Sequence, residues 1–132
     1  MQEGIKEAFG EWLSRYPWDW WATFTFRRPL SNPILAKKHF ESFMAPYKDV
    51  FYFVAVERFF MKDDCHLHAL LGNCSDLSAK EFWAGWFKKY GRCRTEAYNA
   101  GLGARFYLFK YVTKDLFDWD FRLGQFQGKL SL

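Results

Sequence analysis

The nine residues DDCHLHALL, at positions 63–71, decide the fold of this chain. They place His66 and His68 one residue apart inside an apolar run, and His39 is the only other histidine of the sequence. Residues two apart in a β-strand point to the same face, so the two imidazoles project side by side. The opposite face then receives the apolar side chains of Cys65, Leu67 and Ala69. The stretch therefore predicts a strand with half of a metal site on one face.

The preceding segment offers a third ligand. Residues 50–61, VFYFVAVERFFM, are β-branched and aromatic, and KDD at 62–64 is turn-like, which together predict a hairpin. A two-residue turn at Lys62 and Asp63 sets Glu57 opposite His68 and diagonal to His66. All three side chains then share one face. In this register the numbers of two residues that face each other add up to 125, and we call this total the pair sum. A register with an even pair sum would place Glu57 on the far side of the sheet.

Two imidazoles and one carboxylate, with coordination positions left over, suit Mg²⁺ or Mn²⁺ bridging a phosphate. The same ligands also hold Zn²⁺, so the residues alone leave the metal open. An HxH pair on a strand is also compatible with two polar residues on a solvated face. A zinc module lacks a fourth ligand, because the three cysteines show no suitable spacing.

The rest of the chain alternates between helical and extended patterns. We expect an antiparallel sheet with helices on its apolar face, which is an α+β fold. Ser78 and Glu81 form a capping box at one helix start. The expected helices are 2–16, 33–45, 78–91 and 104–117, and the expected strands besides the hairpin are a half-buried strand at 21–26 and a short one at 92–98.

Length and composition limit the classes of protein. The 132 residues, half of them hydrophobic, fit a single domain spanning 1–132 with a ring-rich core. The net charge of +4 slightly favours the binding of polyanions. Charges interrupt every apolar run before the roughly 20 residues needed to span a bilayer. No signal peptide is apparent, so we expect a soluble cytoplasmic protein with no membrane partner and with Cys65, Cys74 and Cys93 reduced.

The segment YLFKYVTK, at 107–114, repeats the pattern Tyr-x-x-Lys without a gap. On a helix, Tyr107, Lys110, Tyr111 and Lys114 fall within an arc of roughly 100°, opposite a more apolar side. A phenol with a pKa of about 10 is a poor nucleophile at neutral pH, and a neighbouring ammonium group favours its ionisation. The alternative is a structural role, in which both tyrosines lie in the core or at its rim and the lysines are solvated.

Taken together, TFTF at 23–26, HLH at 66–68 and the tyrosine-lysine segment resemble the three ordered motifs of the HUH endonucleases, especially the rolling-circle replication initiators, or Rep proteins. The resemblance covers about residues 20–117 and implies a ferredoxin- or RRM-like sheet that carries the histidine pair, with the tyrosine on a nearby helix. It implies cleavage of single-stranded DNA at a replication origin, with His66, His68 and Glu57 holding Mn²⁺ or Mg²⁺.

In this family a tyrosine attacks the scissile phosphate, which forms a 5′-phosphotyrosine and frees a 3′-hydroxyl. The tandem motif resembles that of two-tyrosine phage initiators, whereas Tyr111 to Lys114 alone resembles the single-tyrosine viral form. The resemblance therefore favours Tyr111 as the nucleophile, with Tyr107 a partner or a bystander and Lys110 and Lys114 as assisting cations. This length leaves no room for a helicase domain, so unwinding would fall to a host or separate helicase.

Basic residues are expected to guide the DNA, although a solvated face is the commoner role of surface charge. Two clusters stand out: Arg27 and Arg28 after the first strand, and Lys88, Lys89, Arg92 and Arg94 after the capped helix. Two further functions stay open at this point. One is a small single-strand transposase with the same chemistry, and the other is a non-catalytic module that binds single-stranded nucleic acid through aromatics on an open sheet face.

Overall fold

The computed structural model describes residues 3–59, 61–111 and 116–122. Helices and strands alternate along the chain in an order close to the expected one. In chain order they are α1 (Glu3–Leu13), β1 (Trp18–Phe24), α2 (Pro33–Met44), β2 (Phe51–Phe59), β3 (Asp64–Gly72), α3 (Ala79–Lys89), β4 (Cys93–Ala97), α4 (Gly103–Tyr111) and β5 (Leu116–Arg122).

The five strands form one antiparallel sheet in the order β4-β1-β3-β2-β5. The expected α+β class with a central antiparallel sheet is therefore confirmed. Strand β3, which carries the histidine pair, is the middle strand of the five, between β1 and β2. Its side chains therefore have neighbours from two other strands on either face.

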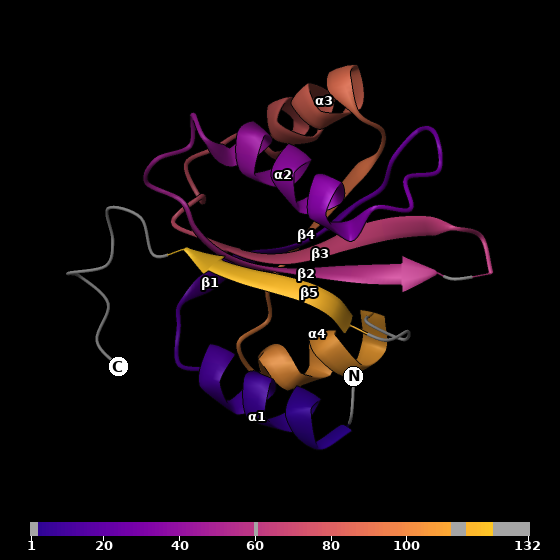
Figure 1. Cartoon of the computed structure of the whole chain (residues 1–132). Coiled ribbons are helices and arrows are strands. Elements are labelled where there is room, and N and C mark those ends of the chain that lie inside the picture. The colour runs from indigo at the N-terminus through magenta and orange to yellow at the C-terminus, as the bar shows by residue number, and fades with distance from the viewer. Residues whose placement is uncertain (1–2, 60, 112–115, 123–132) are drawn as a thin grey trace.

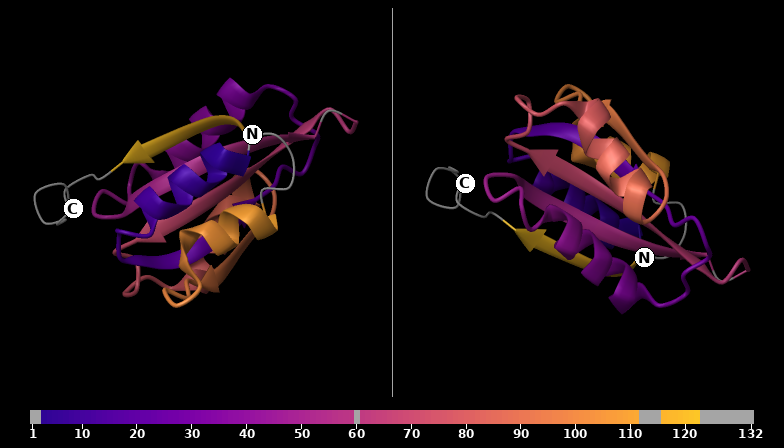
Figure 2. Two further views of the ribbon diagram at one scale, coloured as in Figure 1. Left: turned by 90° about the horizontal axis from the view of Figure 1, so that it is seen from below. Right: turned by 90° about the horizontal axis from the view of Figure 1, so that it is seen from above.

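Helices cover both faces of the sheet, and the expectation of a single covered face is wrong. Figure 1 shows α2 and α3 above the sheet and α1 and α4 below it. The two views of Figure 2 show each pair of helices side by side over its own face. The reason is the composition of β2, in which Phe51 to Val56 are all buried, because a strand apolar on both sides needs cover on both.

Each covered face has its own hydrophobic core. Between the sheet and α2 and α3, the Phe24 ring packs edge to face with the rings of Phe40, Phe82 and Trp86. Between the sheet and α1 and α4 lie Leu13, Trp21, Phe53, Leu70, Tyr107 and Leu108. The histidine pair belongs to this second face, because β3 residues with odd numbers from Cys65 to Leu71 point into the first core.

Local signals explain where the helices begin. The Asn32 side chain accepts hydrogen bonds from the amides of Ile34 and Leu35, and Pro33 takes the first helical position of α2. The Ser78 hydroxyl accepts from the Glu81 amide at the start of α3, as the capping box predicts. At the other end of α3, Gly91 lies so close to the segment after β1 that an added Cβ would come within 2.7 Å of the Arg27 amide nitrogen.

The C-terminal part of the chain differs from the expectation. The helix predicted to reach residue 117 ends at Tyr111 among the described residues, and residues 112–115 lie outside them. Leu116–Arg122 is the edge strand β5, paired with β2. The sequence supports a strand here, because Phe117, Trp119 and Phe121 alternate with polar residues.

Candidate functional site

His66, His68 and Glu57 project from the same face of the sheet, as the sequence predicts. The hairpin register differs from the expected one by two residues, since Glu57 faces His66 and Ala55 faces His68. The pair sum is 123 rather than 125, which is still odd, so Glu57 stays on the histidine side. Glu57 is therefore directly opposite His66 and diagonal to His68.

The expected two-residue turn at Lys62 and Asp63 is wrong, and this accounts for the register. Strand β2 ends at Phe59 and β3 begins at Asp64, so four residues connect them. Asp63 has a φ of 50°, in the left-handed region that aspartate tolerates better than most residues. The longer connection moves every pair by two positions, which preserves the faces and changes only the partners.

The carboxylate of Glu57 and the ring of His68 form a buried pair. His68 Nε2 lies 2.8 Å from Glu57 Oε1, and the two residues are 4% and 1% exposed. The other ring nitrogen, Nδ1, lies 3.4 Å from the hydroxyl oxygen of Thr23, which sits opposite His68 in the β1–β3 register. Strands β1, β2 and β3 thus each contribute one polar side chain at this point.

His66 points toward different groups. Its Nε2 lies 3.4 Å from Asp64 Oδ2, and its ring packs 4.5 Å, centroid to centroid, from that of Phe59. Burial lowers the pKa of His66 below its ordinary value, and the Asp64 carboxylate opposes that shift. The shift favours the neutral imidazole, which is the form that binds a metal ion.

The residue types of His66, His68 and Glu57, and the sheet face that they share, suit the divalent metal that the family resemblance implies. Glu57, which is 1% exposed, lies opposite His66 and is hydrogen-bonded to His68, and all three side chains lie on the same face of the sheet. The side chains are not gathered around one point, however. Within residues 3–59, 61–111 and 116–122, no group of three or more His, Cys, Asp or Glu side chains is arranged to hold a metal ion.

Helix α4 packs beside this cluster through one tryptophan. The ring of Trp21, on β1, stacks on His68 with a centroid distance of 5.8 Å and on Tyr107 with one of 5.4 Å. A continuous line of contacts therefore runs from Glu57 through His68 and Trp21 to Tyr107. This line joins the segments that carry all three of the motifs quoted above.

Tyr107 itself is a core residue. It is 2% exposed, its hydroxyl oxygen accepts a hydrogen bond from the Asn99 amide at 2.7 Å, and its ring stacks on Tyr98. Lys110 is exposed, with its ammonium group 5.3 Å from the Phe106 ring centroid. The expectation that Tyr107 and Lys110 share a polar face is therefore wrong, because α4 turns Tyr107 toward the sheet.

The other two residues of the tyrosine-lysine motif are Tyr111 and Lys114. Tyr111 is the last residue of α4, and its side chain lies outside the described part of the structure. Lys114 lies outside the described residues altogether. Their expected roles stay predictions.

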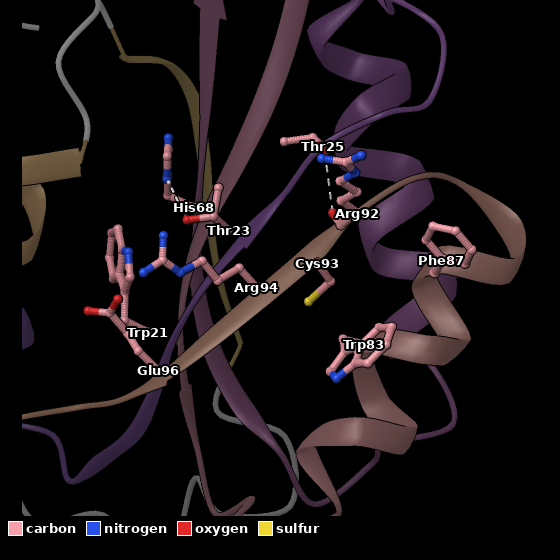
Figure 3. A pocket seen from close by; sticks show the side chains of 10 residues that line it. All are labelled: Trp21, Thr23, Thr25, His68, Trp83, Phe87, Arg92, Cys93, Arg94 and Glu96. Atoms are coloured by element: carbon pink, nitrogen blue, oxygen red, sulfur yellow. Dashed lines mark hydrogen bonds between the residues drawn. The ribbon is translucent and has the colours of Figure 1, made fainter.

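A cavity of about 660 Å³ reaches from the histidine cluster around the edge strand β4. Figure 3 shows Trp21, Thr23 and His68 on one side of β4, and Trp83 and Phe87 of α3 on the other. The Arg94 side chain extends toward Trp21 and Thr23, and the Arg92 side chain lies beside Thr25. Trp83 is 38% exposed and Phe87 49% exposed, although both are large and apolar.

Five of the six basic residues expected to guide DNA line one of two cavities. Arg92 and Arg94 line the cavity at β4. A second cavity, of about 380 Å³, includes Arg27, Arg28 and Lys89 in its wall. Lys88 is exposed on α3 and is not among the residues that line either cavity.

Sequence reasoning missed the aromatic members of the site. Trp21 lies in the strand expected at 21–26, and its ring joins the histidine strand to α4. Trp83 and Phe87 follow the buried pair Phe82 and Trp86 by one residue each. Each pair, Phe82 with Trp86 and Trp83 with Phe87, is spaced four residues apart and so forms a stripe along the helix. One stripe is enough for the buried face, so the second stripe indicated exposed aromatic side chains.

The chain matches no protein-family model, no curated protein and no solved structure. No helix within the described ranges is long and apolar enough to cross a membrane.

Proposed function

We propose that this chain is a metal-dependent endonuclease and strand transferase of the HUH type, which nicks and joins single-stranded DNA to initiate rolling-circle replication. One observation carries the proposal. The three motif segments, far apart in sequence, meet on one sheet face through the contacts of Thr23 with His68, His68 with Trp21, and Trp21 with Tyr107. A chance set of short motifs gives no reason for this convergence.

The register supports the same proposal independently. An odd pair sum brings Glu57 to the histidine face, where it lies in contact with His68. Burying a carboxylate is costly unless it is paired, and at this point Glu57 is paired with His68. His66, His68 and Glu57 would hold the divalent ion, which neutralises charge on the scissile phosphate when it is bound.

The chain's own nucleophile is the phenol of Tyr111. Its oxygen attacks phosphorus, the bond from phosphorus to O3′ breaks, and a bond from phosphorus to the tyrosine oxygen forms. The phenolic proton is lost and the departing 3′-oxygen gains one, so a 3′-hydroxyl and a 5′-phosphotyrosine result. Because one phosphodiester replaces another, a 3′-hydroxyl can reverse the step and join strands. Lys110 and Lys114 assist by favouring the phenolate.

The alternative of a non-catalytic binding module has less support. That function, in its common form, uses aromatic side chains on an open sheet face to stack bases. Here α1 and α4 lie over one face and α2 and α3 over the other (Figure 1). The exposed rings of Trp83 and Phe87 lie on a helix beside the sheet edge instead.

The test is covalent adduct formation. The protein is incubated with end-labelled single-stranded oligonucleotides of random sequence, with Mn²⁺ or with EDTA, and resolved on a denaturing gel. We expect a Mn²⁺-dependent protein–DNA adduct that is lost in Tyr111→Phe and in His66→Ala. The His66 side chain is 30% exposed, so its truncation leaves the core intact.

Tyr47→Phe is the matched control, since its hydroxyl makes no hydrogen bond with a described residue, and it should form adduct like the wild type. An adduct that persists in Tyr111→Phe, or in EDTA, would contradict the proposed chemistry. The absence of any adduct with metal present would remove the endonuclease function.

A further inference from the structure

The two cavities that hold the basic residues are neighbours. Arg27 lines the second cavity, and its guanidinium carbon lies 5.2 Å from the ring centroid of Phe87, which lines the first. An Arg27 N–H also donates to the Phe87 carbonyl oxygen. The two cavities are therefore adjacent and meet at a single arginine–phenylalanine contact.

This path is lined by aromatic rings with cationic side chains on both sides of them. From the histidine cluster outward they include Arg94, Arg92, Trp83, Phe87, Arg27 and Lys89. Glu96 lies at the end near Trp21 (Figure 3). In the second cavity, none of the described lining residues is acidic. His39 adds a ring there, packed 4.8 Å from that of Tyr90 by centroids.

From this arrangement we infer a binding track for one unpaired DNA strand, running from His68 over the edge strand β4 to the pocket formed by Arg27, Arg28 and Lys89. Two bases stack on Trp83 and Phe87, and the neighbouring phosphates contact Arg92, Arg94 and Arg27. The inference rests on the proposed function for the identity of the strand, and it adds the path and the residues that hold it.

Chemical complementarity selects this occupant. Exposed aromatic rings flanked by guanidinium groups match a polymer in which apolar faces alternate with negative charges. The bases of a duplex already stack on one another, so their faces are not free to cover Trp83 and Phe87. An acidic protein segment would use the arginines and leave both rings exposed to water.

The rings are tested by DNA binding in EDTA, where no cleavage takes place. The probe is a fluorescein-labelled 20-nucleotide oligo(dT), and binding is followed by fluorescence anisotropy. Stacking contributes about 1–3 kcal/mol per base, or at least about fivefold in Kd. Trp83→Ala with Phe87→Ala should therefore weaken binding by about 25-fold or more, whereas Trp83→Phe with Phe87→Tyr should restore most of it.

The matched control is Ile34→Ala with Leu35→Ala on α2, whose side chains are 59% and 38% exposed and line neither cavity. It should bind within twofold of the wild type. Both alanine pairs remove exposed apolar groups, and the midpoint of thermal unfolding checks that each variant is folded. A ring variant that is folded and binds oligo(dT) within twofold of the wild type overturns the track.

The phosphate contacts are tested by salt dependence. Each phosphate contact to a single strand contributes about 0.7 to the slope of log K against log salt concentration. Arg92→Gln should lower that slope by about this amount, whereas Arg105→Gln should not change it. Arg105 lies on α4 and pairs with Glu7, 3.0 Å away. Equal slopes for Arg92→Gln and the wild type would remove Arg92 from the track.

The outcomes separate this inference from the proposed function. Loss of oligo(dT) binding in the ring variant, without any metal-dependent adduct in the wild type, supports the track and removes the endonuclease. Adduct formation by the wild type, with binding unchanged in the ring variant, keeps the endonuclease and removes the track. Equally tight binding of a 20-base-pair duplex by the wild type also contradicts the inference, because a track for unpaired bases discriminates against it.

Discussion

Tyr107→Phe separates a structural tyrosine from a catalytic one. The change removes one hydroxyl, which accepts a hydrogen bond from the Asn99 amide at 2.7 Å and lies 3.5 Å from the Ala97 carbonyl oxygen. Leaving a buried donor without a partner costs about 1–3 kcal/mol. Asn99 is exposed, so water reaches the freed amide, and we expect a loss near the lower limit, about 1 kcal/mol.

The assay is urea unfolding followed by tryptophan fluorescence, which reports on this region because Trp21 stacks on Tyr107. With a slope of about 1.5 kcal/mol per molar urea, the midpoint should fall by about 0.7 M. Tyr107→Ala also removes the ring between Trp21 and Tyr98 and should cost about 3–5 kcal/mol. Tyr47→Phe, with no hydrogen bond from its hydroxyl to a described residue, should change stability by less than about 0.5 kcal/mol.

The same variant is then assayed for adduct formation. Tyr107→Phe should retain the ability to form an adduct, because the ring that supports Trp21 is preserved. Unchanged stability combined with loss of the adduct would refute the reasoning, since it would make Tyr107 the nucleophile and its hydrogen bond incidental.

Three further predictions concern other parts of the chain. Asn32→Ala removes the cap of α2 and should lower the free energy of unfolding by about 0.5–2 kcal/mol, while Asn32→Asp keeps the cap; equal stability of the two variants would contradict the capping role. Burial raises the pKa of Cys65 to about 11, so at pH 8 only about one thiol in a thousand is ionised, and labelling by a disulfide reagent followed by peptide mapping should be slow until denaturant is added; rapid labelling of the folded protein would contradict this. Burial raises the pKa of Tyr52 to about 12, while the charge of Arg122 opposes this shift, so the neutral phenol contributes fully to stability below pH 10 and this contribution is lost as the pH rises toward 12. Urea unfolding between pH 10 and pH 12 should therefore show a smaller loss of stability in Tyr52→Phe than in the wild type. Equal losses in the two proteins would contradict this role of Tyr52.

The elements of the fold were largely predictable, because their signals are local. Asn32 with Pro33, and Ser78 with Glu81, mark helix starts through hydrogen bonds that involve only near neighbours. Strand β5 is not predicted although residues 117–122 alternate between aromatic and polar, because the helical pattern of residues 104–111 runs directly into it without a clear stop signal. Cover on both sheet faces was implicit in the unbroken apolar run of β2.

The sheet face on which each side chain of the site lies was predictable, whereas the contacts between these side chains were not. Parity alone decides which side of the sheet Glu57 takes, so the prediction survived a register error of two residues. The partner of each side chain depends on the length of the turn, which the sequence KDD did not determine. The position of Trp21 between His68 and Tyr107 depends on how α4 packs on β1, and no local pattern contains that information.

The central claim is tested most directly by locating the DNA on the protein. Trypsin cleaves after Arg105, Lys110 and Lys114, so the two tyrosines of the motif fall on different peptides, 106–110 and 111–114. The Mn²⁺-dependent adduct is treated with nuclease and trypsin and analysed by mass spectrometry. The proposed mechanism predicts a nucleotide phosphate on Tyr111 in peptide 111–114. A nucleotide on peptide 106–110, or on neither peptide, would contradict it.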